Sequence, residues 1–276
     1  TKSSGYLSSF DSDGFTATAG ASGVINWDQT GRTYVAWNWK AGGTGVSNGS
    51  GTITSNVSAN TAAGFSIVRY TGDDAASATI GHGLSVAPEL IIIKSRDSYE
   101  SWYVGSSVGN LSFTSSDYLT LDSDSGESSS DTIWNDTAPT ASVFTVGTND
   151  AVNNTDDFLA MCFHSVEGYS KVGSYTGNAN ANGTFVYTGF RPAFLIAKNY
   201  GAGGKPWVMY DDKRDPYNEM YHQLVANTTA AANTSEGRLD FVSNGIKWRI
   251  GDSYHNDGSF MYIAFAESPF KTSNAR

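Results

Sequence analysis

An internal repeat limits the fold of this chain more than any other feature. Residues 69–105 align with residues 174–210 at a nearly constant offset. The matched pairs are Tyr70 with Tyr175, Gly83 with Gly189, Pro88 with Pro192, Lys94 with Lys198, and Trp102 with Trp207. The similarity continues where VFTVGT matches DFVSNG and where residues 158–168 match residues 260–270. A self-similar segment of about 100 residues predicts one supersecondary unit that is built twice.

A third, partial copy precedes these two. GYLSSFDSDG resembles DYLTLDSDSG of the first unit, and TYVAWNWKAGG resembles FLAMCFHSVEG, so residues 1–43 correspond to the rear half of a module. We expect another chain or segment to complete that half. Residues 44–63 are rich in glycine and poor in charge, which is typical of a linker or an edge strand. The two complete modules then span residues 64–168 and 169–276.

Composition and patterning favour an all-β fold. Charged residues make up 16% of the chain, whereas it contains 30 glycines and 13% aromatic residues. Short apolar runs such as ELIIIKS are separated by clusters of Gly, Pro, Asn, Asp and Ser, and no segment shows a ten-residue helical period. In GIKWRI, Ile246, Trp248 and Ile250 alternate with charged residues. About seven or eight strands per hundred residues predict two tandem antiparallel β-sandwich modules plus the N-terminal partial module.

Trp37 and Trp39 lie two positions apart in a run that has a counterpart in each unit. In a strand, Val35 would share their face. The aligned faces are Val35, Trp37, Trp39; Leu159, Met161, Phe163; and Met261, Ile263, Phe265. Because this face is large and apolar in every copy, we interpret it as the core face of a central strand. The alternative is an exposed platform for a sugar ring.

Composition excludes several classes of protein. The net charge of −10 argues against nucleic-acid binding, which needs a basic surface. No run of about 18 apolar residues is present, so we expect no membrane insertion. The single cysteine, Cys162, excludes an internal disulfide framework. It aligns with Ala264 inside a strand, which predicts a small buried residue and not a nucleophile.

Motifs for catalysis and metal binding are also missing from the sequence. The four histidines, His82, His164, His222 and His255, form no HxxxH or HxH pair. No phosphate-binding glycine loop occurs. The DSD turns at residues 11–13 and 122–124 offer the oxygen ligands that calcium prefers, but neither continues into a full DxDxDG series. We therefore predict no catalytic residue, no metal and no cofactor, and calcium is the one ion that these turns leave open.

The best candidate for a ligand site is the segment 206–223, PWVMYDDKRDPYNEMYHQ. Planar aromatic side chains stack on sugar rings, and neighbouring Asp and Arg side chains bind hydroxyl groups. The predicted carbohydrate-binding residues are Trp207, Tyr210, Asp211, Arg214 and Tyr217. The alternative is that Trp207, which matches Trp102, serves packing, and that Arg214 forms an ion pair with its acidic neighbours.

The repeated motifs resemble modules of tailed-bacteriophage virion structural proteins. The most distinctive pieces are IWNDTAPTASVFTVGT (133–148) and FVYTGFRPAFLIAKN (185–199), and the similarity covers essentially the whole chain. This resemblance implies concanavalin-like or jelly-roll sandwiches on tail fibres or other virion surface proteins. It supplies no catalytic or ligand residue.

Two functions follow as expectations. The first is a phage virion structural protein, a tail-fibre or capsid-surface component that acts in assembly and host-surface contact. Its partners would be itself, as a homo-oligomer, or other virion subunits, at the virion surface outside the cell. The second is a carbohydrate-binding module that recognises a host-surface polysaccharide. Glycan hydrolysis is the least favoured function, because no acid/base pair can be identified from the sequence.

Overall fold

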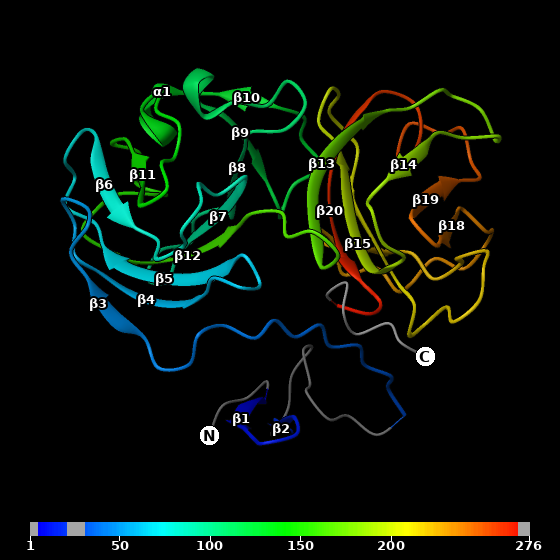
Figure 1. Cartoon of the computed structure of the whole chain (residues 1–276), viewed down its shortest axis with the longest axis horizontal. Coiled ribbons are helices and arrows are strands. Elements are labelled where there is room, and N and C mark those ends of the chain that lie inside the picture. Colours follow the sequence, from blue (N-terminus) through cyan, green and yellow to red (C-terminus); the bar gives the residue numbers. More distant parts are fainter. Residues whose placement is uncertain (1–4, 21–30, 270–276) are drawn as a thin grey trace. The chain divides into compact units, whose positions relative to one another are not determined.

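The computed structural model describes residues 5–20 and 31–269. The chain divides into two compact units, residues 1–39 and residues 40–276. The first unit contains one antiparallel hairpin, β1 (Tyr6–Phe10) with β2 (Phe15–Thr18). The part of the expected N-terminal module that falls on residues 21–30 lies outside the described residues. The second unit is almost entirely β, and its named strands pair antiparallel (Figure 1), as the sequence predicted.

The second unit begins with a pair of sheets that we call the first sheet pair. Its larger sheet has the order β10-β9-β8-β7-β12-β5-β4-β3, and its smaller sheet is β11-β6. The strands are β3 (Val46–Asn48), β4 (Ser55–Asn60), β5 (Phe65–Thr71), β6 (Ala78–Gly81), β7 (Leu90–Ser95), β8 (Tyr103–Ser106), β9 (Asp117–Thr120), β10 (Ser128–Ser129), β11 (Val143–Val146) and β12 (Asp157–Phe163). Two short helical turns, η1 (Phe113–Ser115) and α1 (Asp131–Trp134), lie between strands. Residues 44–63 therefore carry two strands at the edge of the larger sheet.

The second sheet pair follows in the chain. Its larger sheet has the order β13-β20-β15-β16-β17, and its smaller sheet is β14-β19-β18. The strands are β13 (Ser170–Thr176), β14 (Phe185–Tyr187), β15 (Pro192–Asn199), β16 (Trp207–Asp211), β17 (Leu224–Val225), β18 (Leu239–Val242), β19 (Gly245–Trp248) and β20 (Ser259–Ala266).

The two sheet pairs share a strand order. The series β9-β8-β7-β12-β5 of the first corresponds strand for strand to β17-β16-β15-β20-β13 of the second, and β6 pairs with β11 as β14 pairs with β19. This topology corrects one detail of the sequence alignment. VFTVGT contains β11, whose topological counterpart is β19, whereas DFVSNG contains β18, an added strand on the other side of β19. Short alternating strands resemble each other too closely for sequence alone to separate them.

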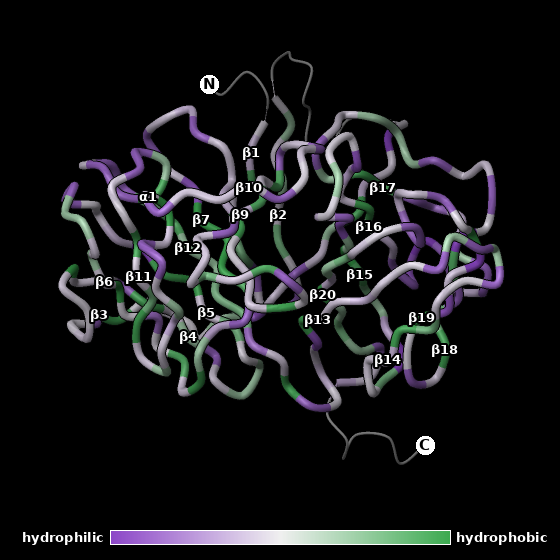
Figure 2. The backbone as a smooth tube through the Cα atoms, turned by 90° about the horizontal axis from the view of Figure 1, so that it is seen from above, coloured by the Kyte–Doolittle hydropathy of each residue, from purple (hydrophilic) through white to green (hydrophobic). Residues whose placement is uncertain are grey.

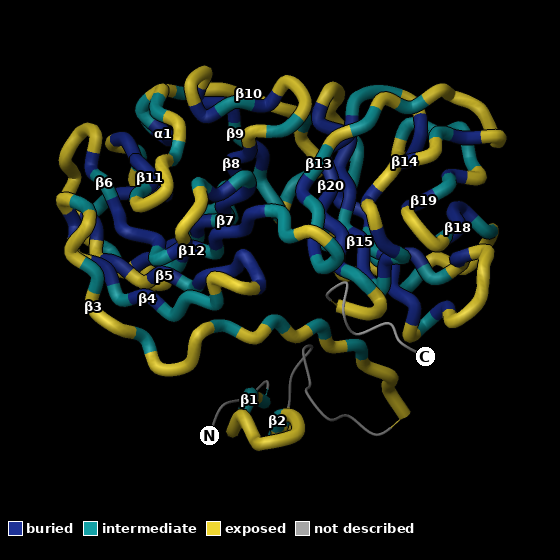
Figure 3. The backbone as a smooth tube through the Cα atoms, in the orientation of Figure 1, coloured by how far each residue is buried: buried dark blue, intermediate teal, exposed yellow. Residues whose placement is uncertain are grey.

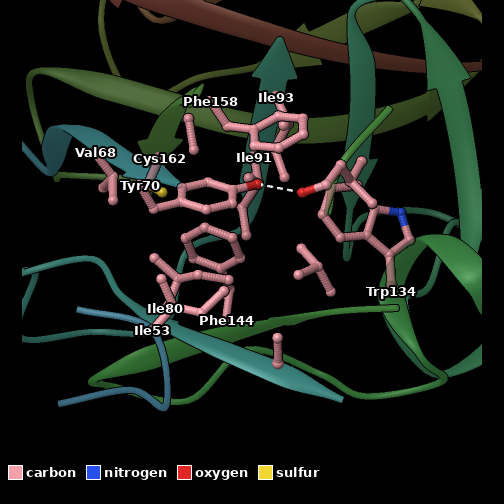
Figure 4. Close-up of a cluster of buried hydrophobic side chains, with 14 of the residues drawn as sticks. Ile53, Val68, Tyr70, Ile80, Ile91, Ile93, Trp134, Phe144, Phe158 and Cys162 are labelled. Atoms are coloured by element: carbon pink, nitrogen blue, oxygen red, sulfur yellow. Dashed lines mark hydrogen bonds between the residues drawn. The ribbon is translucent and has the colours of Figure 1, made fainter. Parts of the chain in front are cut away.

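Each sheet pair encloses its own core. In the first, Ile80 and Phe144 of the small sheet pack with residues of the large sheet that include Ile91 and Cys162 (Figure 4). In the second, strands β14, β18 and β19 face β15, β16 and β20 in the same way. Hydrophobic residues therefore gather in the strands, and hydrophilic ones in the connecting loops (Figure 2). Burial follows the same division (Figure 3). Two sheets around one apolar layer form a β-sandwich.

The central strand of each large sheet reveals which face points to the core. Phe158, Ala160 and Cys162 of β12 have no exposed surface and belong to the core, whereas Leu159 and Met161 on the other face are half-buried. The sequence prediction that Leu159, Met161 and Phe163 form the core face is therefore wrong for β12. Alternation defines two faces, but it does not say which one meets the second sheet. In β20 both faces are buried, as expected for a central strand.

Residues 34–39 differ more from the expectation, because they form no strand. Val35, Trp37 and Trp39 are half-buried, while Tyr34, Ala36 and Asn38 are exposed. The predicted alternation is present, but the predicted burial on both faces is not. By register, the tryptophans match the face of β12 that points away from its core.

The tyrosine of the repeated YTG motif makes the same long-range hydrogen bond in both sheet pairs. We call this hydrogen bond, with the buried asparagine beside it, the lock. The hydroxyl of Tyr70 donates to the carbonyl oxygen of Val152 at 2.7 Å (dashed in Figure 4), and the hydroxyl of Tyr175 donates to the carbonyl oxygen of His255 at 2.5 Å. The next residue in each case is a fully buried asparagine, Asn153 or Asn256. Burial raises the pKa of Tyr70 well above its usual value, so the phenol stays protonated and keeps donating.

The two buried asparagines complete the lock. Asn153 Nδ2 donates to the carbonyl oxygens of Ala75 and Gly147, and Asn256 Nδ2 donates to Asn178 Oδ1 and to the carbonyl oxygen of Asn180. A Cβ on Gly72 would clash with the backbone of Asn154, and a Cβ on Gly177 would clash with the backbone of Asn256. Close backbone approach therefore explains the glycine of the motif, and hydrogen bonding explains its tyrosine.

We predict that Tyr70→Phe and Tyr175→Phe each destabilise the protein by about 1–2 kcal/mol, because each leaves a buried carbonyl without its donor. Urea unfolding would measure this. Tyr118→Phe is the matched control, since the half-buried Tyr118 makes no hydroxyl hydrogen bond within the described residues. Equal midpoints for Tyr70→Phe and the control would refute the lock.

Candidate functional site

The five predicted carbohydrate-binding residues do not share one surface. Trp207 is 3% exposed, Tyr210 has no exposed surface and Asp211 is buried, whereas Tyr217 is 82% exposed. Arg214 is half-buried, and its Nε lies 2.6 Å from Asp211 Oδ2. Trp207 and Tyr210 therefore cannot stack on a sugar ring as predicted. For Arg214, the alternative of an ion pair with an acidic neighbour is the one that the structure shows.

The loop between β16 and β17, residues 211–223, is held by buried carboxylates. Asp211 Oδ1 accepts from the backbone N–H groups of Lys213 and Arg214. Asp215 Oδ2 accepts from the N–H groups of Tyr221 and His222, and its Oδ1 lies 2.6 Å from His222 Nδ1. Carboxylates that accept several backbone hydrogen bonds fix a loop. This 211–223 loop presents Tyr217 and Tyr221 to solvent on a rigid base.

A buried chain of hydrogen bonds lies beneath it. Asp252 Oδ1 is 2.6 Å from His255 Nδ1, and His255 Nε2 is 2.9 Å from the hydroxyl of Tyr210. Burial lowers the pKa of His255, and the Asp252 carboxylate opposes that shift. His255 is 1% exposed and Tyr210 is fully buried, whereas the side chain of Asp252 is 41% exposed, so the series runs from the surface into the second core. Its role is to satisfy polar groups inside the second core.

A surface groove lies on the first sheet pair, along the loop from β7 to β8. We call it the 94–102 groove; it measures about 700 Å³ and is lined by residues 94–102 and Asp122. Tyr99 is fully exposed and Trp102 is half-buried. Lys94 Nζ donates to the carbonyl oxygens of Ser95 and Ser98 and so closes the loop on itself. The groove combines aromatic faces with charges of both signs.

The equivalent loop of the second sheet pair, residues 198–207, is covered by the hairpin formed by β9 and β10, residues 117–129. Lys205 N–H donates to the Asp124 carbonyl oxygen at 3.0 Å, and Glu127 N–H donates to the Tyr200 carbonyl oxygen at 2.8 Å. The indole N–H of Trp207 donates to the Thr120 carbonyl oxygen at 2.9 Å. We call this contact the junction.

A short connection and an aromatic contact join the sheet pairs at another place. The connection runs from β12 to β13, and within it the backbone of Val166 pairs with that of Ser170. The rings of Phe163 and Phe265 meet edge to face, with centroids 6.2 Å apart. Together with the junction, this connection and the aromatic contact join the two sheet pairs at two places.

Lys198 is the most unusual residue of the junction. Its side chain has no exposed surface, and its Nζ donates to the carbonyl oxygens of Asp124, at 3.1 Å, and of Lys205. Burial lowers the pKa of Lys198 to about 8, and the nearby Asp124 carboxylate counteracts part of that effect. Lys94 and Lys198 occupy matched positions of the repeat, and the sequence alone predicted a role for neither. The match between the two lysines was the one sequence signal for a role. A lysine is rarely buried without a partner, and Lys198 is buried.

Other candidate groups from the sequence are structural or exposed. Cys162 is fully buried, and burial raises its thiol pKa to about 12, so it is the inert filler that its alignment predicted. Asp122 and Asp124 are exposed turn residues. Within residues 5–20 and 31–269, no three His, Cys, Asp or Glu side chains come together as metal ligands do. The helices of this part of the chain are too short to span a bilayer.

Comparison with known proteins identifies the family. Residues 1–269 match the family described as Domain of unknown function (DUF7483), and the chain belongs to it. No curated protein and no solved structure matches the chain.

The pKa of Lys198 predicts a pH dependence of stability. Between pH 8 and about 10, the unfolded chain keeps the lysine proton while the folded protein releases it, so the free energy of unfolding rises with pH. We expect a gain of about 2 kcal/mol over this range, and we expect Lys198→Met to abolish it. Urea unfolding of both proteins at several pH values measures the difference in their free energies of unfolding. Tyrosine ionisation contributes equally to both proteins and therefore cancels. Parallel pH profiles would contradict a buried ammonium at the junction.

Proposed function

We propose that this chain is a non-enzymatic structural component of a tailed-bacteriophage virion, on a tail fibre or the capsid surface. Its role is assembly with itself or other virion subunits and contact with the host surface. The motifs that resemble phage virion modules support this proposal. They include YTG, which builds the lock of each core, and so they describe architecture and not a reaction site.

The junction is the observation that carries the proposal. Two sandwiches of one strand order are held together by backbone hydrogen bonds, a buried lysine and an indole, at positions that recur in the repeat. A repeated unit that carries its own contact to the next unit suits an extended or surface-coating assembly.

Immunogold labelling of intact phage particles tests this proposal. Antibodies raised against the purified protein should label the surface of particles produced by the phage that carries the gene. Mass spectrometry of the same gradient-purified particles should recover peptides from both sheet pairs. Protein that is abundant in the lysate yet absent from purified particles would contradict a virion role.

The second candidate function is binding of a host-surface polysaccharide, and the 211–223 loop favours it. Tyr217 is 82% exposed and Tyr221 is 42% exposed, on a backbone that Asp211 and Asp215 hold in place. Exposed tyrosines on a rigid loop give stacking area at low entropic cost, as sugar recognition requires. In this proposal the exposed Tyr217 and Tyr221 stack on the sugar, in place of the buried Trp207 and Tyr210 of the sequence prediction.

Glycan arrays test this second candidate. We predict that Tyr217→Ala together with Tyr221→Ala abolishes array binding and changes the melting temperature little, because both side chains are exposed residues of the loop surface. Tyr99→Ala, an exposed tyrosine of the other sheet pair, is the matched control and should bind like the unmodified protein. An array without any signal for the unmodified protein would end this proposal.

A further inference from the structure

The junction shows how a hairpin of this repeat is received by the next unit. Carbonyl oxygens of the β9–β10 hairpin accept from three groups of the 198–207 loop: the Trp207 indole, the Lys205 N–H and the Lys198 ammonium. The acceptors are Thr120 for the first and Asp124, in the DSD turn, for the other two. The contact is made mostly by backbone on the side of the hairpin, so it depends on hairpin geometry more than on side chains.

The first sheet pair carries the same receiving surface without a β9–β10 hairpin on it. Trp102 matches Trp207 in the repeat, lines the 94–102 groove and is half-buried, whereas Trp207 is covered. The indole N–H of Trp102 makes no hydrogen bond within residues 5–20 and 31–269, while that of Trp207 binds a hairpin carbonyl. Lys94 matches Lys198 and closes on its own loop carbonyls. A tryptophan in a groove of about 700 Å³ is typical of an interface anchor.

The chain also contains a second hairpin with an acidic turn, and its strands pair closer to that turn, up to Phe10 and Phe15, than β9 and β10 do. β1 and β2 flank the turn DSDG, and GYLSSFDSDG aligns with DYLTLDSDSG of the β9–β10 hairpin. With one extra residue between Ser8 and Asp11, Ser8 corresponds to Thr120 and Asp13 to Asp124. Phe10 is 81% exposed. A two-stranded hairpin is marginally stable alone and gains stability when it packs on a partner.

We propose that the 94–102 groove receives the β1–β2 hairpin, residues 6–18, of a second copy of this chain. A carbonyl near Ser8 would accept from the Trp102 indole, as the Thr120 carbonyl accepts from the Trp207 indole at the junction. One hairpin and one groove per chain make a head-to-tail contact, which repeats into a ring or a filament. The inference deepens the assembly role proposed above and rests on it.

Chain connectivity favours a second copy as the source of the hairpin. At the junction, the strand that ends the first sheet pair, β12, is followed by β13 after a short connection, which keeps the hairpin and the 198–207 loop in register. In the first sheet pair, β3 and β4 precede β5 in the chain, in the place of such a connection, and extend the sheet beyond β5. No strand pairs with the corresponding outer edge of β13 in the described part of the chain. The short connection that precedes β13 therefore has no counterpart before β5.

Cysteine cross-linking of the full chain tests this inference. Asp13→Cys and Glu100→Cys are the counterparts of Asp124 and Lys205, whose backbones are hydrogen-bonded at the junction. When the two single variants are mixed and oxidised, a link can form only between chains. We expect a disulfide-bonded heterodimer in at least about tenfold excess over a mixture of Asp13→Cys with Lys213→Cys, because docking raises the local thiol concentration to the mM range. The native Cys162 is fully buried and does not interfere.

Two further variants make the result decisive. Asp124→Cys with Lys205→Cys in one chain should close an internal disulfide and so report that the chemistry works at the junction. Trp102→Ala in the Glu100→Cys chain should reduce the heterodimer severalfold, with an unchanged circular dichroism spectrum.

Three outcomes would overturn the inference. These are no heterodimer while the junction disulfide forms, a heterodimer that ignores Trp102→Ala, and a chain with both Asp13→Cys and Glu100→Cys that closes only on itself. Virion labelling reads out the proposed function separately. Labelled particles without the cross-link would leave the virion role standing and reject this contact.

Discussion

A buried ammonium group at the boundary of two sandwiches governs the arrangement of the second unit. Lys198 has no exposed surface, and its Nζ donates to carbonyl oxygens of both the 198–207 loop and the β9–β10 hairpin. Moving a charge out of water is costly unless hydrogen bonds replace its hydration. The two carbonyls provide that replacement only while the hairpin and the loop stay together. Separation of the two sheet pairs would therefore break the set of acceptors that makes the burial of Lys198 tolerable.

The rigidity of each sandwich supports this contact. The Tyr70 and Tyr175 locks join the end of the first strand of each repeat to the loop before its last strand, over a span of about eighty residues. With both ends of each repeat fixed, the hairpin and its receiving loop keep their positions relative to the core. The short connection from β12 to β13 adds a covalent limit. The result is a repeat that specifies both a fold and the way its neighbour attaches.

The sequence predicted the architecture better than the site. The all-β class, the repeat and the burial of Cys162 and Trp248 follow from alternation and self-alignment, because core positions must stay apolar in each copy. Alternation could not tell that Phe158 and not Leu159 faces the small sheet, because that depends on where the second layer lies. It also could not separate β18 from β19 as the counterpart of β11.

The candidate site was harder to predict because its key contacts cross between repeats. Trp207 in a polar, aromatic segment has the composition of a sugar site, yet its indole points to a carbonyl more than eighty residues away in sequence. Nothing local distinguishes that tryptophan from an exposed one. The match between Trp102 and Trp207 did indicate a structural role, and the structure adds that the two copies have different surroundings.

Amide hydrogen exchange by NMR tests the central claim, that the junction is a fixed part of the fold, most directly. The decisive amides are those of Glu127 and Lys205, which donate across the junction to the carbonyls of Tyr200 and Asp124. Our account predicts that both exchange within about tenfold of the slow amides of β15, because they open only when the sandwiches separate. Exchange of these two amides at the rate of an unprotected loop, while β15 stays protected, would show that the two sandwiches move independently.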